Sequence, residues 1–310
     1  MQSWRQALNS WTILDQVIII RRLAPSQSSM NEKISKVGFI GLGRMGKPMA
    51  INILQAGFGL AVHDAREQPV LELASLGAKV AQSPREVAED GDLVEIVVVD
   101  DAQVDDVLLG DRGVLQGARD GTIIAIHSTV YPETVRKIAK HAGAKGVQVI
   151  DAPVSGGEAG AREKSLCYMV GGELALLERC REVFSTSASE IFHMGALGSG
   201  AAAKMIVQVV TCINMLAVHE AEMLAERGGL EFAALQKVLH ESSGQSFVTD
   251  NWINRFKLPQ DSIEIRRRRT EVFQKSLAPA IEIARQMGLS LPGAVLAERL
   301  LPRIMGIEDS

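Results

Sequence analysis

Short runs rich in β-branched residues alternate with stretches of helical periodicity between Lys36 and about Gly195. The runs are KVGFIGLG, LAVHD, LVEIVVVD, TIIAIHS, VQVIDAP, CYMVGG and EIFHMG. Strands that alternate with helices in this way form a mostly parallel sheet, because each helix carries the chain back across one face of the sheet. The sequence therefore predicts an α/β domain with a doubly wound sheet over residues 34–196.

A second pattern begins after Gly198, where long helical periodicities replace the strand runs. The first predicted helix covers about Ser199–Arg227 and ends at the pair Gly228 and Gly229, since glycine commonly terminates helices. Residues 197–310 are therefore predicted to form an all-α domain.

Residues 1–33 stand apart from both patterns and are predicted to be a disordered extension. Their one short apolar run, Val17 to Ile20, is far below the roughly 20 residues that span a bilayer, and the later stretch Ala201 to Leu216 is also too short. Met30 is an alternative start, and the arginines and serines before it weakly match a mitochondrial transit peptide. We expect a cytoplasmic protein, or a matrix protein if that peptide is used, and no membrane partner.

The formal net charge of −4 provides no positive field, and only 4% of the residues are aromatic, so nucleic acid is not an expected partner. Cys167, Cys180 and Cys212 are too few and too irregularly spaced for a disulfide framework or a metal cage. No metal site is predicted, and the cysteines are expected to fill the core of a protein in a reducing compartment. Small molecules remain as the expected ligands.

A glycine-rich loop follows the first predicted strand, with the sequence Gly41, Leu42, Gly43, Arg44, Met45 and Gly46. Gly41 permits a tight turn, Gly43 allows the backbone to approach a pyrophosphate, and Gly46 allows the next helix to pack closely against the sheet. Because this GxGxxG motif lies between a strand and a helix, it predicts a Rossmann-type dinucleotide-binding domain.

Asp64 ends the second predicted strand, 21 positions after Gly43 (64 − 43 = 21). A carboxylate at about this distance binds the adenosine ribose hydroxyls and repels a 2′-phosphate, so NAD is the preferred cofactor. Arg66 lies two positions further on and can soften that repulsion, which keeps NADP possible.

Hydroxyl groups lie in two further segments that follow predicted strands. Ser155, Gly156 and Gly157 form a loop whose backbone N–H groups and hydroxyl can hold a substrate carboxylate, and the alternative is a plain strand-to-helix turn. Ser128 and Thr129 end another strand, where open α/β sheets bind ligands, although either residue alternatively caps the next helix.

Lys204 is the only charged residue between Ala201 and Leu216, a stretch predicted to be helical. A buried, unpaired ammonium is costly, so a lysine in such a helix indicates a function; the alternative is a lysine of the first turn whose side chain reaches water. Gln208 lies four positions later, so its amide shares the face of Lys204 and can orient that lysine or a substrate hydroxyl.

The segment Phe39 to Asn52, FIGLGRMGKPMAIN, resembles the signature of the β-hydroxyacid dehydrogenase family. Three further blocks follow in the family's order, STVYP from Ser128, DAPVSGG from Asp151 and GSGAAAK from Gly198. The resemblance covers roughly Lys36 to Pro292 and implies an oxidoreductase that transfers a hydride between a nicotinamide cofactor and a small β-hydroxy acid or its semialdehyde.

The resemblance also implies roles for single residues. Lys204 is expected to be the general acid and base, with its amine kept neutral by burial and by the nicotinamide cation. Ser128 is expected to lie beside the nicotinamide and the substrate, Thr129 to contact the cofactor, and Lys275 to close over both ligands. Family members dimerise through the helical region, which here carries many apolar residues, so we expect a homodimer or a homotetramer.

Several residues set this chain apart from the family pattern. Gln208 stands where the family usually has asparagine, so the amide group is kept, and Val207 replaces another common asparagine. After Lys275, Ser276 stands where the family usually has an acid. The residues concerned are His127, Lys164, Val207, Gln208, Arg266 to Arg269 and Ser276. They predict a substrate pocket altered from the best-known members, although the arginine run alternatively forms a solvated helix face.

Two other functions remain open. Imine reductases share this architecture but generally lack a lysine at the position of Lys204. A protein that binds a nucleotide without turnover is the second alternative, suggested by Val207 and Ser276.

Overall fold

The computed structural model describes residues 33–258 and 260–307. Apart from Lys33, the predicted N-terminal extension lies outside the described residues. The chain forms two compact units, Met1–Ala201 and Ala202–Ser310, and helix α10 (Ser199–Arg227) passes from one into the other. The predicted domain limits at residues 196 and 197 stay a prediction.

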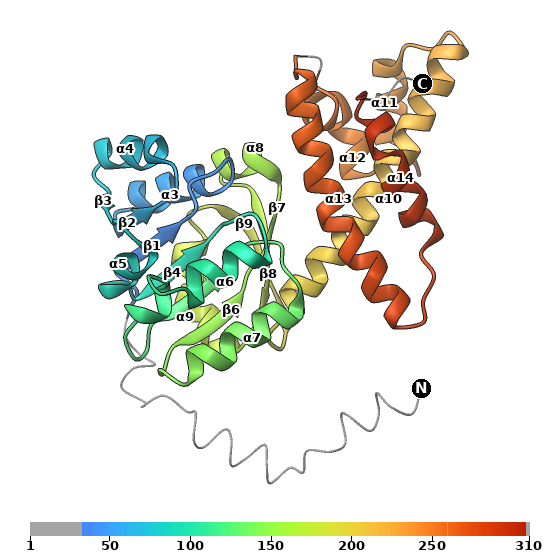
Figure 1. Cartoon of the computed structure of the whole chain (residues 1–310). Coiled ribbons are helices and arrows are strands. Elements are labelled where there is room, and N and C mark those ends of the chain that lie inside the picture. The colour runs from blue at the N-terminus through green and yellow to red at the C-terminus, as the bar shows by residue number, and fades with distance from the viewer. Residues whose placement is uncertain (1–32, 259, 308–310) are drawn as a thin grey trace. The chain divides into compact units, whose positions relative to one another are not determined.

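In its described part, the first unit is built on a nine-stranded sheet (Figure 1). The strands are β1 (Lys36–Ile40), β2 (Gly59–His63), β3 (Lys79–Val80), β4 (Leu93–Ile96), β5 (Ile123–Ile126), β6 (Gln148–Asp151), β7 (Val154–Ser155), β8 (Leu166–Gly171) and β9 (Ala188–Gly195). Six of them run parallel in the order β3-β2-β1-β4-β5-β6, which confirms the predicted doubly wound fold. Strand β8 is antiparallel to β6 and β7, and β9 is parallel to β8.

Helices cover both faces of this sheet, because the buried side chains of each strand point alternately to the two sides. The helices are α3 (Gly46–Gln55), α4 (Glu67–Ser75), α5 (Pro84–Glu89), α6 (Asp101–Leu109), α7 (Pro132–Gly143), α8 (Gly157–Arg162) and α9 (Leu174–Phe184), with a 3₁₀ turn at Val114–Gln116. Phe39 of β1 belongs to one apolar cluster with Phe184, and the next residue, Ile40, belongs to the opposite cluster with Ile138. Burying each such side chain stabilises the fold by about 1.5–3 kcal/mol.

The second unit consists of helices in its described part, as the sequence predicted. After α10 come α11 (Phe232–His240), α12 (Phe247–Asp250), a π-helical turn (Trp252–Phe256), α13 (Ile263–Gln286) and α14 (Pro292–Ile304). Their apolar faces meet in one core that includes Met215, Trp252, Leu277 and Leu301. The predicted end of the first helix at Arg227 is confirmed.

Helix α10 is long and apolar enough to cross a bilayer by length and composition, which the sequence analysis did not expect. Half of its most apolar window is buried, as in the core helix of a soluble protein. Cys212 and Met215 of this helix are fully buried.

The order of the parallel strands reverses at β1, which has β2 on one side and β4 on the other. In open α/β sheets, ligands bind beyond the carboxyl ends of the strands at such a reversal. The glycine-rich loop follows the end of β1, Asp64 follows β2, and Ser128 lies just after β5. Ser155 ends β7, the short strand that comes after β6. The fold therefore places these predicted residues of the first unit at the same edge of the sheet.

Candidate active site

The glycine-rich loop has the backbone that its sequence predicted. Gly41 has a φ of 95°, and a Cβ there would lie 2.1 Å from the carbonyl oxygen of Val97. A Cβ on Gly46 would lie 1.9 Å from the carbonyl oxygen of Gly41, so a larger residue would push helix α3 off the sheet. A Cβ on Gly43 would meet no described atom within 4 Å, which leaves open space beside the loop.

Helix α3 begins at this loop, and among the described residues no side chain caps its first turn. Its N-cap residue is Met45, and no acidic side chain lies in the first turn. The uncapped N–H groups and the positive end of the helix dipole suit an anion such as a pyrophosphate.

The Asp64 carboxylate is hydrogen-bonded to the glycine-rich loop and to Arg66. It accepts hydrogen bonds from the Leu42 amide (2.6 Å), the Arg66 amide (2.8 Å) and the Arg66 guanidinium (3.0 Å to Oδ1). Burial raises the pKa of Asp64, but these bonds and the charge of Arg66 outweigh that effect and hold the pKa below its usual value. Asp64 is therefore a carboxylate that ties the glycine-rich loop to the end of β2.

A pocket of about 310 Å³ lies beside the loop. Its lining contains four cationic side chains, those of Arg44, Lys47, Arg66 and Arg162. Two carboxylates balance part of this charge: Glu72 pairs with Lys47 at 2.7 Å, and Glu158 pairs with Arg44 and Arg162. The sequence analysis missed Lys47, Arg162 and both glutamates. The pairs Arg44–Glu158 and Lys47–Glu72 join residues 114 and 25 positions apart, and the i,i+4 pair of Arg162 with Glu158 does not by itself indicate a pocket.

Ser128 is buried, and its Oγ accepts a hydrogen bond from the Val98 amide at 2.9 Å. Helix α7 starts at Pro132 with Tyr131 as its N-cap, and no described side chain caps it. The alternative that Ser128 or Thr129 caps this helix is therefore wrong. Ser128 instead joins the carboxyl ends of β4 and β5, and Thr129 is half-buried beside it.

Ser155 ends β7, and the turn through Gly156 leads to Gly157, the first residue of α8. Gly156 and Gly157 have φ values of 129° and 67°, a backbone region that favours glycine. A Cβ on Gly157 would meet no described atom within 4 Å, so the turn borders open space. This backbone explains the glycine pair and leaves its predicted role as a carboxylate site a proposal.

Asp151, at the end of β6, holds the first turn of α10. Its carboxylate accepts hydrogen bonds from the amides of Gly198 and Ala201, both at 2.7 Å. Burial raises the pKa of Asp151, and these backbone bonds oppose the rise. The sequence analysis placed Asp151 in a family block but gave it no role, because its partners lie about 50 residues away.

Lys204 and Gln208 lie one turn apart on α10 and are 9% and 7% exposed. Ile206 and Val210, on another face of the same helix, are 66% and 53% exposed. In this turn of α10, two polar side chains are therefore buried while two apolar ones are exposed, the reverse of the usual pattern on a surface helix. Lys204 is not an exposed lysine.

Lys275 is an exposed residue of α13, whereas the next residue, Ser276, is buried and donates its hydroxyl to the carbonyl of Val272 at 2.9 Å. An acid at position 276 would not make this bond to a carbonyl. The neighbouring arginine run belongs to the same helix, and Arg269 pairs with Asp261 and with the carbonyl of Arg255.

Lys164 follows α8 with a φ of 59°, in the region that favours glycine. The Ser165 amide donates to the carbonyl of Gly160 across it, as in a helix end that normally uses glycine. This turn explains why glycine is usual there. His127 is buried inside the first unit and does not line the pocket beside the loop.

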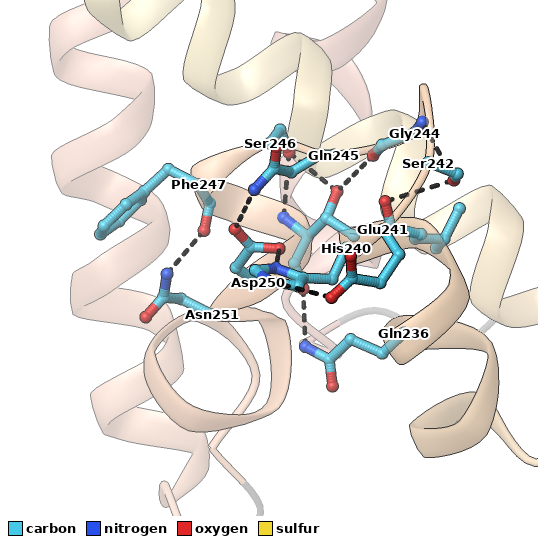
Figure 2. Close-up of polar contacts among 12 residues, drawn as sticks. Gln236, His240, Glu241, Ser242, Gly244, Gln245, Ser246, Phe247, Asp250 and Asn251 are labelled. Atoms are coloured by element: carbon cyan, nitrogen blue, oxygen red, sulfur yellow. Dashed lines mark hydrogen bonds and ion pairs between the residues drawn. The ribbon is translucent and has the colours of Figure 1, made fainter.

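A polar cluster joins α11 to α12 in the second unit (Figure 2). His240 Nδ1 lies 2.8 Å from the Asp250 carboxylate, and the Gln236 amide donates to the carbonyl of Thr249 at 2.6 Å. The hydrogen bond and the charge of Asp250 raise the pKa of His240. The ion pair is therefore complete below about pH 6.5 and is lost as the pH rises through the raised pKa. The cluster contains no predicted site residue.

Comparison with known proteins gives two family matches. Residues 36–195 match the family described as the NAD binding domain of 6-phosphogluconate dehydrogenase. Residues 198–306 match the family described as NAD-binding of NADP-dependent 3-hydroxyisobutyrate dehydrogenase. The two matches together span most of the described chain.

Relatives with assigned activities match over nearly the whole chain. The 2-(hydroxymethyl)glutarate dehydrogenase of Eubacterium barkeri is 34% identical over 89% of this chain and 92% of its own length. The 2-hydroxy-3-oxopropionate reductase of Escherichia coli is 35% identical over 86% of this chain and 89% of its own length. The structure of a Mycobacterium tuberculosis 3-hydroxyisobutyrate dehydrogenase with L-serine aligns with a TM-score of 0.75 at 29% identity, over 87% of this chain and 93% of that one.

Proposed function

The chain belongs to the β-hydroxyacid dehydrogenase family, and from that premise we propose that it oxidises a small β-hydroxy acid, or reduces the matching semialdehyde, with Lys204 as the proton-transfer group. Its relatives are NAD(P)-dependent dehydrogenases and reductases that act on hydroxyl groups. The observation that carries the role of Lys204 is its burial on an otherwise uncharged stretch of α10, one turn before the buried Gln208.

A bound nicotinamide cofactor supplies the hydride chemistry. Lys204 handles the proton: in oxidation its neutral Nζ accepts the proton of the substrate hydroxyl, and in reduction its ammonium returns a proton to the forming alkoxide. Gln208 orients Lys204 or the substrate hydroxyl by hydrogen bonding, since its amide lies on the same helix face.

The residues of the glycine-rich loop fit a dinucleotide. Gly43 borders open space, α3 has an uncapped first turn, and Asp64 stands at the end of β2. We assign cofactor binding to these groups together with Thr129 and Lys275. The remaining members of this set are Gly41, Leu42, Arg44, Met45 and Gly46.

The substrate class follows from the relatives' names and from the turn after β7. The named substrates 2-(hydroxymethyl)glutarate and 2-hydroxy-3-oxopropionate are small carboxylates with a hydroxymethyl or aldehyde carbon beside the carbon that bears the carboxylate. In our proposal Ser155, Gly156 and Gly157 hold that carboxylate, and Ser128 contacts the substrate near the reacting carbon. Holding the carboxylate fixes which carbon faces the cofactor.

A panel assay tests this function. We expect NAD⁺ or NADP⁺ reduction with 3-hydroxyisobutyrate, 2-(hydroxymethyl)glutarate, L-serine, glycerate, threonate or γ-hydroxybutyrate. Cyclic imines with reduced cofactor form the comparison arm. Turnover of imines alone would favour an imine reductase, and cofactor binding without any turnover would favour the non-catalytic alternative.

Cofactor choice gives a prediction at Asp64. We expect the protein to bind NADH more tightly than NADPH, because the Asp64 carboxylate accepts ribose hydroxyls and repels a phosphate. Asp64→Ala should narrow or invert the difference by freeing Arg66 from its ion pair. Fluorescence titration of both cofactors measures this, with Arg66→Ala as the control that should weaken NADPH binding only. Native preference for NADPH would remove the argument from Asp64.

Assembly gives a second prediction. Helix α10 exposes Ile206, Val210 and Leu224, the last to 76%, and such a set of exposed apolar side chains on one helix indicates a protein interface. We propose a homodimer or homotetramer. Light scattering should give a multiple of the 33.5 kDa chain mass, and a monomer at micromolar concentration would contradict the proposal.

We propose the cytoplasm as the site of action. The three cysteines form no disulfide, although all of them lie in the described part of the chain. A reducing compartment suits this state.

A further inference from the structure

A carboxylate and an imidazole lie side by side in the interior of the first unit. Glu95 of β4 is 1% exposed, and His127, directly after β5, is 4% exposed. His127 Nε2 lies 3.4 Å from Glu95 Oε2. Two ionisable side chains in an apolar interior are costly to bury, and apolar residues would fill this space at less cost.

Two aromatic rings flank the pair. The rings of Tyr168 and Phe184 pack edge-on against His127, with centroids 5.5 Å away in each case. Burial raises the pKa of Tyr168, and the charge of Glu95 raises it further, so this hydroxyl stays neutral; the same two effects act on the Cys180 thiol. Among the described residues neither oxygen of Glu95 has a hydrogen-bond partner. His127 Nε2 is therefore the polar group that the Glu95 carboxyl faces.

The other nitrogen of His127 makes a directed contact. Nδ1 lies 2.7 Å from the carbonyl oxygen of Ala152. A carbonyl oxygen only accepts hydrogen bonds, so Nδ1 must carry a proton. Nε2 then faces the Glu95 carboxyl group at 3.4 Å, and this contact together with the bond to Ala152 fixes the orientation of the ring.

Ala152 connects this pair to the proposed substrate site. Its amide donates to the carbonyl of Ile126 at 2.8 Å, and its carbonyl accepts from His127, so both of its backbone polar groups are held by β5 and the residue after it. Ala152 is followed after Pro153 and Val154 by Ser155 and the glycine pair. The contacts run from β4 through β5 to Ala152, and the short strand β7 continues from there to Ser155.

We propose that Glu95 and His127 are positioning residues, which hold Ala152 and so fix the turn of Ser155, Gly156 and Gly157 in the conformation that receives the substrate carboxylate. The inference rests on the proposed function of that turn. It assigns a role in substrate binding to a buried pair that touches neither ligand.

Two variants separate this role from simple core packing. Glu95→Gln replaces the carboxyl group by an amide that can donate to Nε2, so His127 can keep its proton on Nδ1 and still bind Ala152. The double variant Glu95→Leu/His127→Leu replaces the pair by apolar side chains of similar size, a change that buried ion pairs often tolerate without loss of stability. It removes the bond to Ala152.

The expected result is a split between kinetic constants. In the double variant KM for the best substrate of the panel should rise about tenfold, as expected for one lost hydrogen bond, while kcat and the NADH Kd change by less than about twofold. Glu95→Gln should keep KM within about twofold of the native value. Urea unfolding checks that both variants fold, and ¹⁵N NMR of the His127 ring should show a protonated Nδ1 in the native protein and in Glu95→Gln.

The outcomes are distinguishable from failure of the proposed function. If the native enzyme turns over a hydroxy acid and the double variant folds with an unchanged KM, the pair is only core packing and the inference is overturned. If the double variant does not fold, Glu95→Gln still tests the inference, because a tenfold rise of KM in that single variant would overturn it. If the native protein turns over no hydroxy acid or semialdehyde, the proposed function and the inference fall together.

Discussion

Replacement of Lys204 by methionine is expected to lower kcat by about 10²- to 10⁴-fold, the range that general acid–base catalysis supplies. Methionine keeps the length and the apolar stem of the side chain but cannot accept or donate the proton. Lys204 is only 9% exposed, and methionine is well suited to a buried position, so we expect the fold and the NADH Kd to be preserved. Steady-state kinetics on the best substrate of the panel, with NADH titration beside it, measures both quantities.

Lys204→Arg is the matched control for charge. Its guanidinium keeps the positive charge and the hydrogen-bond donors but stays protonated at any working pH, so it cannot act as the base. We expect it to be almost as inactive as the methionine variant. In the native enzyme, alcohol oxidation should rise with pH as the amine loses its proton, and carbonyl reduction should favour lower pH. If Lys204→Met keeps most of its kcat, the catalytic assignment is wrong.

Gly43→Ala is expected to weaken NADH binding by about 100-fold without unfolding the protein. A Cβ at this position meets no described atom within 4 Å, so the fold tolerates it. The same Cβ would keep a pyrophosphate away from the loop, with the loss of about two hydrogen bonds to a charged group at about 1.5 kcal/mol each. Fluorescence titration with NADH and urea unfolding of the same samples measure affinity and stability.

Two other glycines provide the controls for that variant. A Cβ on Gly143, in the last turn of α7, would also meet no described atom within 4 Å, so Gly143→Ala should leave the NADH Kd unchanged. Gly46→Ala should destabilise the first unit, since its Cβ would lie 1.9 Å from a backbone oxygen. Native NADH affinity in Gly43→Ala would contradict the assignment of the loop.

The parts of the fold that local pattern determines were predictable from the sequence. The glycine-rich loop, the strands around it and the end of α10 at Arg227 depend on residue type and spacing within one segment, and the structure confirms them. The antiparallel course of β8 was not predicted, because the pattern of apolar residues in a strand does not show its direction. The fold class was predicted correctly because the six parallel strands produce most of the alternation of strands and helices in the sequence.

The polar contacts around the candidate site were the part that sequence reasoning missed. Glu95 and His127 are separated by 32 positions (127 − 95 = 32), and Arg44 and Glu158 by 114. Each residue by itself looks unremarkable, because its role depends on a partner that only the folded sheet brings close. His127 was predicted to be a feature of the substrate pocket, whereas the structure shows it inside the first unit with its ring turned to Glu95 and Ala152.

Transfer of deuterium from the cofactor tests the proposed chemistry most directly. The protein is incubated with 2-hydroxy-3-oxopropionate, or the best semialdehyde of the panel, and with NADH or NADPH that carries deuterium in place of both hydrogens at C4 of the nicotinamide. Mass spectrometry and NMR of the product should show one deuterium on the carbon that was the aldehyde, and Lys204→Met should slow its appearance by about 10²-fold or more. A product without deuterium, or transfer to cyclic imines and to no semialdehyde, would contradict the account.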